Sequence, residues 1–195
     1  TGGPSARVQA RGGVGGAGTR AEAGFAAVAP LCVVGPHMTG IGGDCDALVS
    51  EPDKPVWGYN GSGRAGAKAS DAALRAQGLS EIGASIHAVT LPGALDAWDA
   101  LLKAHGRFGL DRNLQTAIKY AENGFPVAPR VAWDWSRYVD KLKLSPGPTK
   151  QYLFNGRPPR EGAVIPFPAL APPFKTLSAP GPPHTASVRG GARPR

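Results

Sequence analysis

The sequence predicts an α+β fold, because a pair of short strands is followed by a run of amphipathic helices. The apolar segments Ala47–Val49 and Val56–Tyr59 flank the turn-forming residues 51–55, which is the pattern of a β-hairpin. Between residues 95 and 142, apolar side chains recur at three- and four-residue spacing, as in helices that pack on a core. The order of these elements does not indicate the alternating strands and helices of a parallel sheet.

An apolar run precedes the hairpin. Phe25–Val34 is continuously apolar and predicts a buried helix or strand. It is too short to span a bilayer, so no membrane span is expected. It also lies too deep in the chain, and contains Pro30, for the core of a signal peptide. Residues 1–24 are rich in Gly, Ala and Arg, and we expect them to supply no core face.

Three helices are predicted after the hairpin. Gly106 is placed to end the first helix, and Asp111 is placed as the N-cap of the second, which Gly124 ends. Pro129 fits the first turn of the third helix. Beyond residues 145–148 the helical periodicity is lost. The side chains expected to face inward are Leu95, Trp98 and Leu102, then Leu114, Ala117, Ile118 and Ala121, then Val131, Trp135, Tyr138 and Leu142.

The net charge of +8 is unevenly distributed. From Lys141 onward there are nine Lys or Arg residues and one acid, Glu161, whereas the charges before this point balance. Because these basic residues lack helical spacing and accompany few aromatics, no specific nucleic-acid binding is expected. A solvated tail is the favoured interpretation, and weak, salt-sensitive binding of polyanions by that tail is the alternative.

The cysteines and histidines do not form a recognisable site. Cys32 and Cys45 lack the number and spacing of a disulfide framework, and the four histidines are too scattered for metal-ligand spacing. No metal and no cofactor are therefore expected, and the cellular location is left open.

Five local sequences resemble the large subunit of the γ-glutamyltranspeptidases, also called γ-glutamyltransferases or glutathione hydrolases. They occur in that family's order and together cover about residues 26–177. Because five ordered matches are far more specific than one, the resemblance is strong. The five sequences are Val33–Asp44, Asn60–Ala65, His87–Ala94, Gln115–Ala121 with Gly124–Val127, and Pro168–Ala171.

The resemblance implies an N-terminal-nucleophile hydrolase fold, an αββα sandwich of which this chain would be the large-subunit portion. It implies a precursor that cleaves itself and frees a threonine at the start of a small subunit. That threonine attacks a γ-glutamyl amide such as glutathione and passes the acyl group to water or an amino acid. The small subunit is the expected partner, and no catalytic residue is expected in this chain, which alone is predicted to be inactive.

Thr1 offers an alternative nucleophile. The residues after it, Gly-Gly-Pro, do not match the start of the family's small subunit, and the large-subunit motifs lie downstream. We therefore interpret Thr1 as an accident of where the sequence begins.

Arg64 is the candidate substrate-binding residue. In the family, an arginine in a strand–loop of the large subunit binds the α-carboxylate of the glutamyl group, and Arg64 lies in the corresponding motif. Members with the sequence Arg-Glu-x-Ala-Pro place the arginine two positions earlier, where this chain has Ser62. A surface-loop or helix-capping arginine is the alternative interpretation.

Other motif residues are given structural interpretations. Gly40, Gly42 and Gly43 are expected to meet backbone-turn requirements, because the motif lacks the lysine of a phosphate-binding loop. His37 is expected to form a structural hydrogen bond, since no partner acid is visible in the sequence. Cys45 is expected to be an inert thiol, because a neighbouring carboxylate raises a thiol pKa.

Several positions depart from the family pattern. Gly35 stands where glutamate is usual, and Asp46 stands where a strand normally begins with an apolar residue, so a buried Asp46 would be costly. Family likeness is also weak before Phe25 and after Leu177. We hypothesise a reading-frame error or a decaying gene at both ends.

The resulting assignment is a low-complexity segment at 1–24, a γ-glutamyltranspeptidase-like fragment at 25–178 and a disordered Pro/Arg-rich tail at 179–195. A cephalosporin-acylase-like amidase of the same fold is the alternative chemistry. A noncatalytic remnant with a polyanion-binding tail is the alternative from another functional class.

Overall fold

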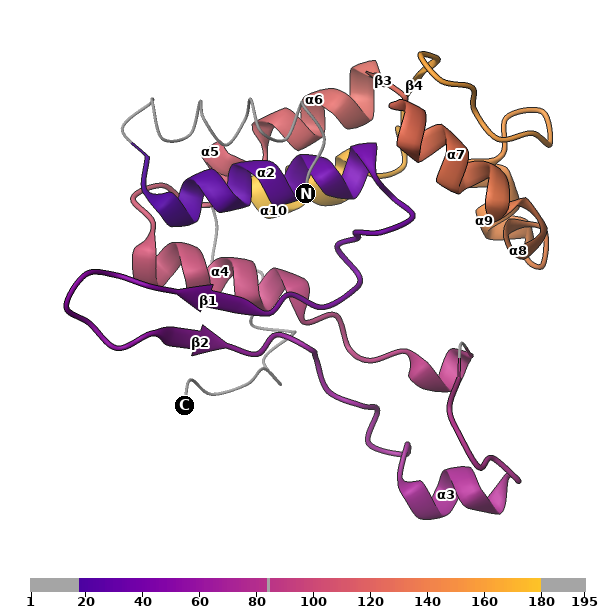
Figure 1. Ribbon diagram of the computed structural model, residues 1–195, viewed down its shortest axis with the longest axis horizontal. Coiled ribbons are helices and arrows are strands. Elements are labelled where there is room, and N and C mark those ends of the chain that lie inside the picture. The colour runs from indigo at the N-terminus through magenta and orange to yellow at the C-terminus, as the bar shows by residue number, and fades with distance from the viewer. Residues whose placement is uncertain (1–17, 84, 180–195) are drawn as a thin grey trace. The chain divides into compact units, whose positions relative to one another are not determined.

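The computed structural model describes residues 18–83 and 85–179, drawn as a ribbon in Figure 1. The chain divides into two compact units. The helical unit contains the described residues up to Gly40 and from Leu102 onward, and the hairpin unit contains residues 41–101. The expectations for Thr1 and for the tail from residue 180 onward lie outside the described residues.

Helix α2 (Arg20–Val34) is the centre of the helical unit. Its N-terminus is a capping box, in which the Thr19 hydroxyl accepts a hydrogen bond from the Glu22 amide and the Glu22 carboxylate accepts one from the Thr19 amide. The helix therefore begins before the apolar run, and Glu22 and Ala23 are buried. The expectation that residues before Phe25 supply no core face is wrong, and the boundary expected after residue 24 falls inside this helix.

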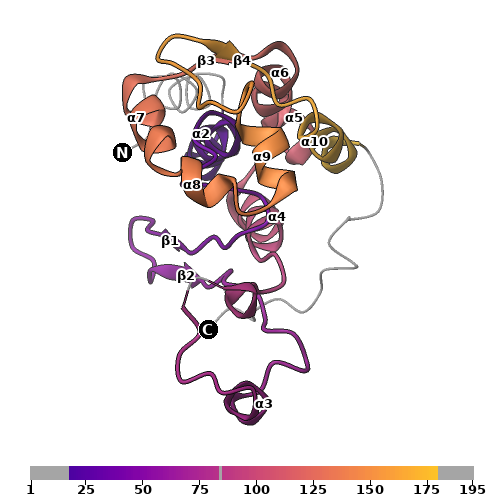
Figure 2. The ribbon, with the colours of Figure 1, turned by 90° about the vertical axis from the view of Figure 1, so that its right-hand side faces the viewer.

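Two helices, α5 (Leu110–Asn113) and α6 (Gln115–Asn123), pack against α2, and a third, α10 (Ala171–Ser178), packs against α5 and α6, as Figures 1 and 2 show from two directions. Gly124, at φ 86°, ends α6 as predicted. Asp111 is not an N-cap, because Gly109 occupies the cap position of α5 and Asp111 lies inside its first turn. The buried side chains here include Phe25, Ala29, Val33, Leu114, Ala117, Ile118, Ala121 and Phe174.

The third predicted helix is divided into α7 (Pro129–Arg137) and α8 (Val139–Leu142). Pro129 lies in the first turn of α7, as predicted, and Trp135 is buried. Tyr138 was expected to face inward but is 44% exposed. The reason is that its backbone, at φ −101° and ψ 6°, leaves the helical conformation and ends α7, so the periodicity of one continuous helix does not extend through it.

The segment after Leu144 is more ordered than the sequence indicates. It contains α9 (Pro146–Tyr152) and α10, and the short strand β3 (Phe125–Pro126) pairs antiparallel with β4 (Val164–Ile165). Both helices have proline at N1 or N2, where its missing N–H costs nothing. The loss of helical periodicity after residues 145–148 therefore does not mark the end of regular structure, because helices of seven and eight residues are too short to show a clear apolar repeat.

The hairpin unit contains the predicted β-hairpin. β1 (Ala47–Val49) pairs antiparallel with β2 (Trp57–Tyr59), and Leu48 lies opposite Gly58. The unit also contains α3 (Asp71–Ala76), the 3₁₀ turn η1 (Ile86–Ala88) and the start of α4 (Ala94–His105). The division between the two units falls inside α4, which was predicted to end at Gly106 and does so.

Tyr59 connects the hairpin to helix α4. Its buried hydroxyl donates a 2.6 Å hydrogen bond to Asp96 Oδ2. Burial and this carboxylate partner both raise the pKa of Tyr59. Within the described residues, no helix has the length and apolar character needed to cross a membrane.

Candidate substrate-binding loop

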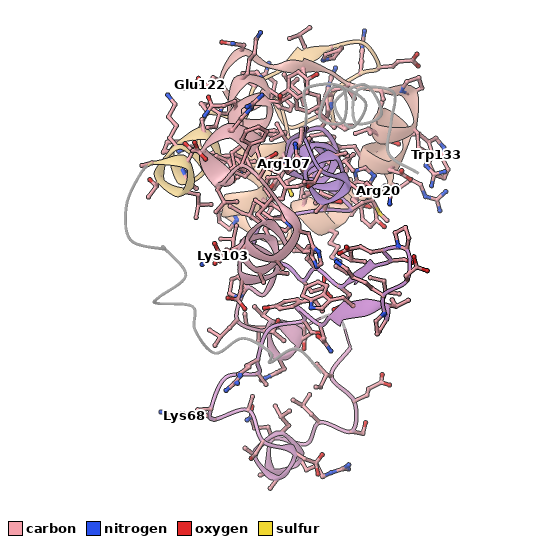
Figure 3. The ribbon with its side chains drawn as sticks, turned by 90° about the vertical axis from the view of Figure 1, so that its left-hand side faces the viewer. Arg20, Lys68, Lys103, Arg107, Glu122 and Trp133 are labelled. Atoms are coloured by element: carbon pink, nitrogen blue, oxygen red, sulfur yellow. The ribbon has the colours of Figure 1, made fainter. Side chains whose placement is uncertain are left out.

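Arg64 lies in the loop that follows β2. Its side chain is exposed, and it forms no ion pair with any acid among the described residues. The next cation along the chain, Lys68, is also exposed and projects from the loop between β2 and α3 in Figure 3. The Arg64 guanidinium is therefore available to an anionic ligand.

An Asx turn precedes Arg64. The Asn60 carboxamide oxygen accepts a 3.0 Å hydrogen bond from the Ser62 amide, and the Ser62 hydroxyl donates to the same oxygen. These bonds fix the direction in which the chain leaves β2.

A second segment, residues 90–94, holds the loop from the other side. The Thr90 hydroxyl donates a 3.0 Å hydrogen bond to the Ser62 carbonyl. The Leu91 amide donates a 2.8 Å hydrogen bond to the Arg64 carbonyl. The backbone on both sides of Gly63 is thus fixed by two consecutive residues of another segment.

A third segment, residues 43–46, completes the arrangement. The Gly43 carbonyl accepts hydrogen bonds from the Gly93 and Ala94 amides at 3.1 and 3.0 Å. The Cys45 amide donates to the Gly61 carbonyl at 3.2 Å. We call residues 43–46, 60–64 and 90–94 the three-segment junction. Three of the five sequence motifs contribute to it.

Glycine is required at three positions of the junction. A Cβ on Gly61 would lie 2.5 Å from the Cys45 carbonyl oxygen. Gly63 has φ +77°, and a Cβ there would lie 1.8 Å from the Leu91 carbonyl oxygen. A Cβ on Gly93 would lie 2.0 Å from the Gly61 carbonyl oxygen. Any larger residue would therefore have to separate the segments that hold Arg64.

Asp46 and Cys45 have defined environments in the junction. Asp46 is exposed, and its carboxylate accepts a 3.2 Å hydrogen bond from the Gly61 amide, so the expected cost of a buried, unpaired aspartate does not arise. Burial raises the pKa of the Cys45 thiol, and the carboxylates of Asp46 and Asp44 add to this. The predicted rise in the thiol pKa is confirmed, although burial is its largest cause.

His37 belongs to the helical unit and has an acidic partner. Its Nε2 lies 3.2 Å from Asp134 Oδ2 on α7, which also accepts a 2.7 Å hydrogen bond from Arg130 Nε. Hydrogen bonding to Arg130 lowers the pKa of Asp134. The structural hydrogen bond predicted for His37 is confirmed. The expectation of no partner acid is wrong, because Asp134 is distant in the sequence.

The structure shows no backbone requirement for glycine at positions 40 and 42, contrary to the expectation. Neither has a positive φ, and a Cβ at either position would meet no atom within 4 Å. Gly43 contributes its carbonyl to the junction. Among the described residues, no group of His, Cys, Asp and Glu is arranged to hold a metal ion.

The motifs that meet at the junction are shared with known proteins. The sequence model of the family described as gamma-glutamyltranspeptidase matches residues 15–185. The chain belongs to the gamma-glutamyltranspeptidase family. The match extends past residues 26–177 in both directions, so the expected lack of family likeness before Phe25 and after Leu177 is corrected.

Several curated members of the gamma-glutamyltranspeptidase family are similar in sequence. A glutathione hydrolase-like proenzyme of Bacillus subtilis is 36% identical over 146 residues, covering 74% of this chain and 28% of the relative. An oxamate amidohydrolase proenzyme of Klebsiella pneumoniae is 33% identical over 169 residues, covering 84% of this chain and 32% of the relative. The chain therefore spans about a third of the length of these curated relatives.

Solved structures confirm the predicted fold. A cephalosporin acylase from Bacillus halodurans has a TM-score of 0.83 and 32% identity, covering 91% of this chain and 34% of that chain. The γ-glutamyltranspeptidase of Helicobacter pylori has a TM-score of 0.84, covering 91% of this chain and 52% of that chain, and its 22% identity supports the fold alone. The chain is part of the N-terminal-nucleophile hydrolase fold, as the sequence resemblance predicts.

Proposed function

We propose that this chain supplies the carboxylate-binding part of an enzyme that cleaves γ-glutamyl amides such as glutathione. Arg64 binds the α-carboxylate of the glutamyl group. A threonine at the start of a small subunit, outside this sequence, attacks the amide and passes the acyl group to water or an amino acid. The observation that supports this role is the exposed Arg64 guanidinium, without an acidic partner among the described residues, on a backbone held by the three-segment junction.

The chemistry of Arg64 suits this role. Guanidinium presents a planar fork of N–H donors that matches the two oxygens of a carboxylate. An arginine already paired with a protein acid would have to break that pair before binding substrate. Arg64 has no such competitor among the described acids, and its backbone is ordered before the ligand arrives, which lowers the entropic cost of binding.

The exposed apolar side chains of the hairpin unit support a small-subunit partner. Leu48 on β1 is 82% exposed and Ile86 in η1 is 76% exposed, with Val56 and Val89 also largely exposed. The sheet formed by β1 and β2 has only two strands among the described residues, so its outer edges have no strand partner there. A small subunit that extends this sheet would cover both features.

A cephalosporin-acylase-like amidase is the second candidate. The 32% identity to the Bacillus halodurans acylase favours it, and Arg64 could bind the terminal carboxylate of a glutaryl group in the same way. The two acyl groups differ by the α-amino group. A glutaryl anilide, which lacks only that amine, therefore separates the two chemistries.

Release of 4-nitroaniline tests the proposal. The chain would be assayed alone and after co-expression with a matching small subunit, using γ-glutamyl and glutaryl 4-nitroanilides. We expect turnover only with the small subunit and a preference for the γ-glutamyl compound; preference for the glutaryl compound would favour the acylase. Turnover by the chain alone that is abolished by replacing Thr1 would contradict the proposal. No turnover in any combination, with salt-sensitive binding of a polyanion, would favour the noncatalytic alternative.

A further inference from the structure

We propose that Thr90 is a positioning residue that sets the preference for carboxylate ligands by holding the backbone from which Arg64 projects. This inference rests on the proposed role of Arg64 in binding a carboxylate. Thr90 and Arg64 belong to different sequence motifs, and neither motif alone indicates that they act together.

Two hydrogen bonds connect the segments on either side of Gly63. The Thr90 hydroxyl donates to the Ser62 carbonyl at 3.0 Å, and the Leu91 amide donates to the Arg64 carbonyl at 2.8 Å. Because the donors are consecutive and the acceptors are two residues apart, the pair fixes both position and direction of the backbone at Arg64.

Of these two hydrogen bonds, only the one from Thr90 involves a side chain. Its partner Ser62 already uses its amide and hydroxyl in bonds to Asn60, so the Thr90 hydroxyl engages the remaining polar group of that residue. Gly63 cannot add support, because its positive φ and close approach to Leu91 exclude a side chain. Removing the Thr90 hydroxyl therefore removes the hydrogen bond to Ser62 and leaves the Leu91–Arg64 backbone hydrogen bond in place.

The expected consequence is a change in ligand preference. A long, exposed arginine already loses rotamer freedom when it binds a carboxylate. If the backbone at Arg64 is also mobile, more conformational entropy is lost on binding. This entropic cost weakens the binding only of ligands that Arg64 contacts. The affinity for a ligand without a carboxylate should not depend on the Thr90–Ser62 hydrogen bond. This difference distinguishes a positioning role from a general structural one.

The experiment is an NMR titration of the chain itself with two probes, γ-glutamyl-4-nitroanilide and 4-aminobutyryl-4-nitroanilide, which lacks the α-carboxylate. The observables are the Arg64 Nε–Hε signal, assigned by its loss in Arg64→Gln, and the ratio of the two dissociation constants. Thr90→Val removes the hydroxyl with little change in shape, and Thr90→Ser retains it. Thr90→Ala replaces Thr90→Val if circular dichroism shows that the valine disturbs folding.

We expect the chain and Thr90→Ser to prefer the carboxylated probe and Thr90→Val to lose roughly threefold to tenfold of that preference, the range for one hydrogen bond. Exchange of the Leu91 amide should quicken in Thr90→Val and recover in Thr90→Ser. An unchanged ratio in Thr90→Val, with preference lost in Arg64→Gln, would overturn the role of Thr90 alone. An unchanged ratio in Arg64→Gln would overturn the proposed function and this inference together.

Discussion

The two units of the chain are stabilised in different ways. In the helical unit, α2 packs against α5 and α6, and the buried carboxylate of Glu22, 2% exposed, accepts hydrogen bonds from the amides of Thr19, Arg107 and Phe108. In the hairpin unit, the three-segment junction is held mainly by backbone hydrogen bonds and by glycines that permit close approach. Side-chain burial thus stabilises one unit, whereas backbone geometry in the other presents Arg64 to solvent.

This difference predicts which substitutions affect folding and which affect recognition. Substitutions in the helical core should lower the free energy of unfolding. Substitutions in the junction should act on the presentation of Arg64, with glycine positions more sensitive than side-chain positions.

The largest effect is expected for Glu22→Ala. The substitution removes the acceptor of three backbone amides. One of them is the amide of Arg107, labelled in Figure 3, which lies 2.8 Å from Glu22 Oε1. We expect a loss of about 3 kcal/mol in the free energy of unfolding, because three hydrogen bonds to a buried, charged acceptor are lost together. Urea denaturation followed by circular dichroism measures it. Glu122→Gln, which removes a half-exposed pair with Lys175, is the matched control and should cost less than about 1 kcal/mol.

The next effect is expected for Gly93→Ala. The added Cβ would lie 2.0 Å from the Gly61 carbonyl oxygen, so the 60–64 and 90–94 segments must separate. We expect about 2 kcal/mol of destabilisation and loss of carboxylate preference, measured by thermal unfolding and ligand titration. Gly66→Ala is the control, because a Cβ there meets no atom within 4 Å. Equal effects of the two substitutions would show that the junction does not depend on close backbone approach.

A smaller effect is expected for Tyr59→Phe. This substitution removes the 2.6 Å hydrogen bond to Asp96 but retains the buried ring. We expect a loss of about 1 kcal/mol in the free energy of unfolding. Tyr138→Phe, at an exposed position, should change it by less than half as much. Because its pKa is raised, Tyr59 should also ionise after exposed tyrosines in an alkaline absorbance titration.

The pH dependence of stability should reflect the carboxylate of Glu22. Burial alone would raise its pKa, but hydrogen bonds from the Thr19, Phe108 and Arg107 amides together lower it below the ordinary value of 4.5. A folded-state pKa below the unfolded one gives stability that is present above about pH 4.5 and lost as pH falls through the folded value. Denaturation from pH 6 to pH 3 should show this loss. The loss should be smaller in Glu22→Gln, and an equal loss in both proteins would assign it to other groups.

Local sequence patterns predicted the hairpin and the centres of the helices, because turn residues and apolar periodicity act over short distances. The capping box of Thr19 and Glu22 was also visible in the sequence, but the glycine-rich surroundings obscured it. The short helices α9 and α10 were not predicted, because seven and eight residues show no clear apolar repeat, although proline suits a first helical turn.

The candidate site could be predicted only in part. Family resemblance identified Arg64, but the contacts that hold it could not be read from the sequence. The bond from Thr90 to Ser62 connects separate motifs, and nothing in either motif specifies the other. The same holds for His37 and Asp134, which meet across the helical unit.

The most direct test of the central claim compares substrates with and without an α-carboxylate in the enzyme reconstituted with its small subunit. KM would be measured for γ-glutamyl and 4-aminobutyryl 4-nitroanilide with the native chain, Arg64→Lys and Arg64→Gln. If Arg64 binds the carboxylate, its replacement should raise KM for the γ-glutamyl compound alone, more in Arg64→Gln than in Arg64→Lys. An equal change in KM for both compounds, or no change, would contradict the assignment of Arg64 to the substrate carboxylate.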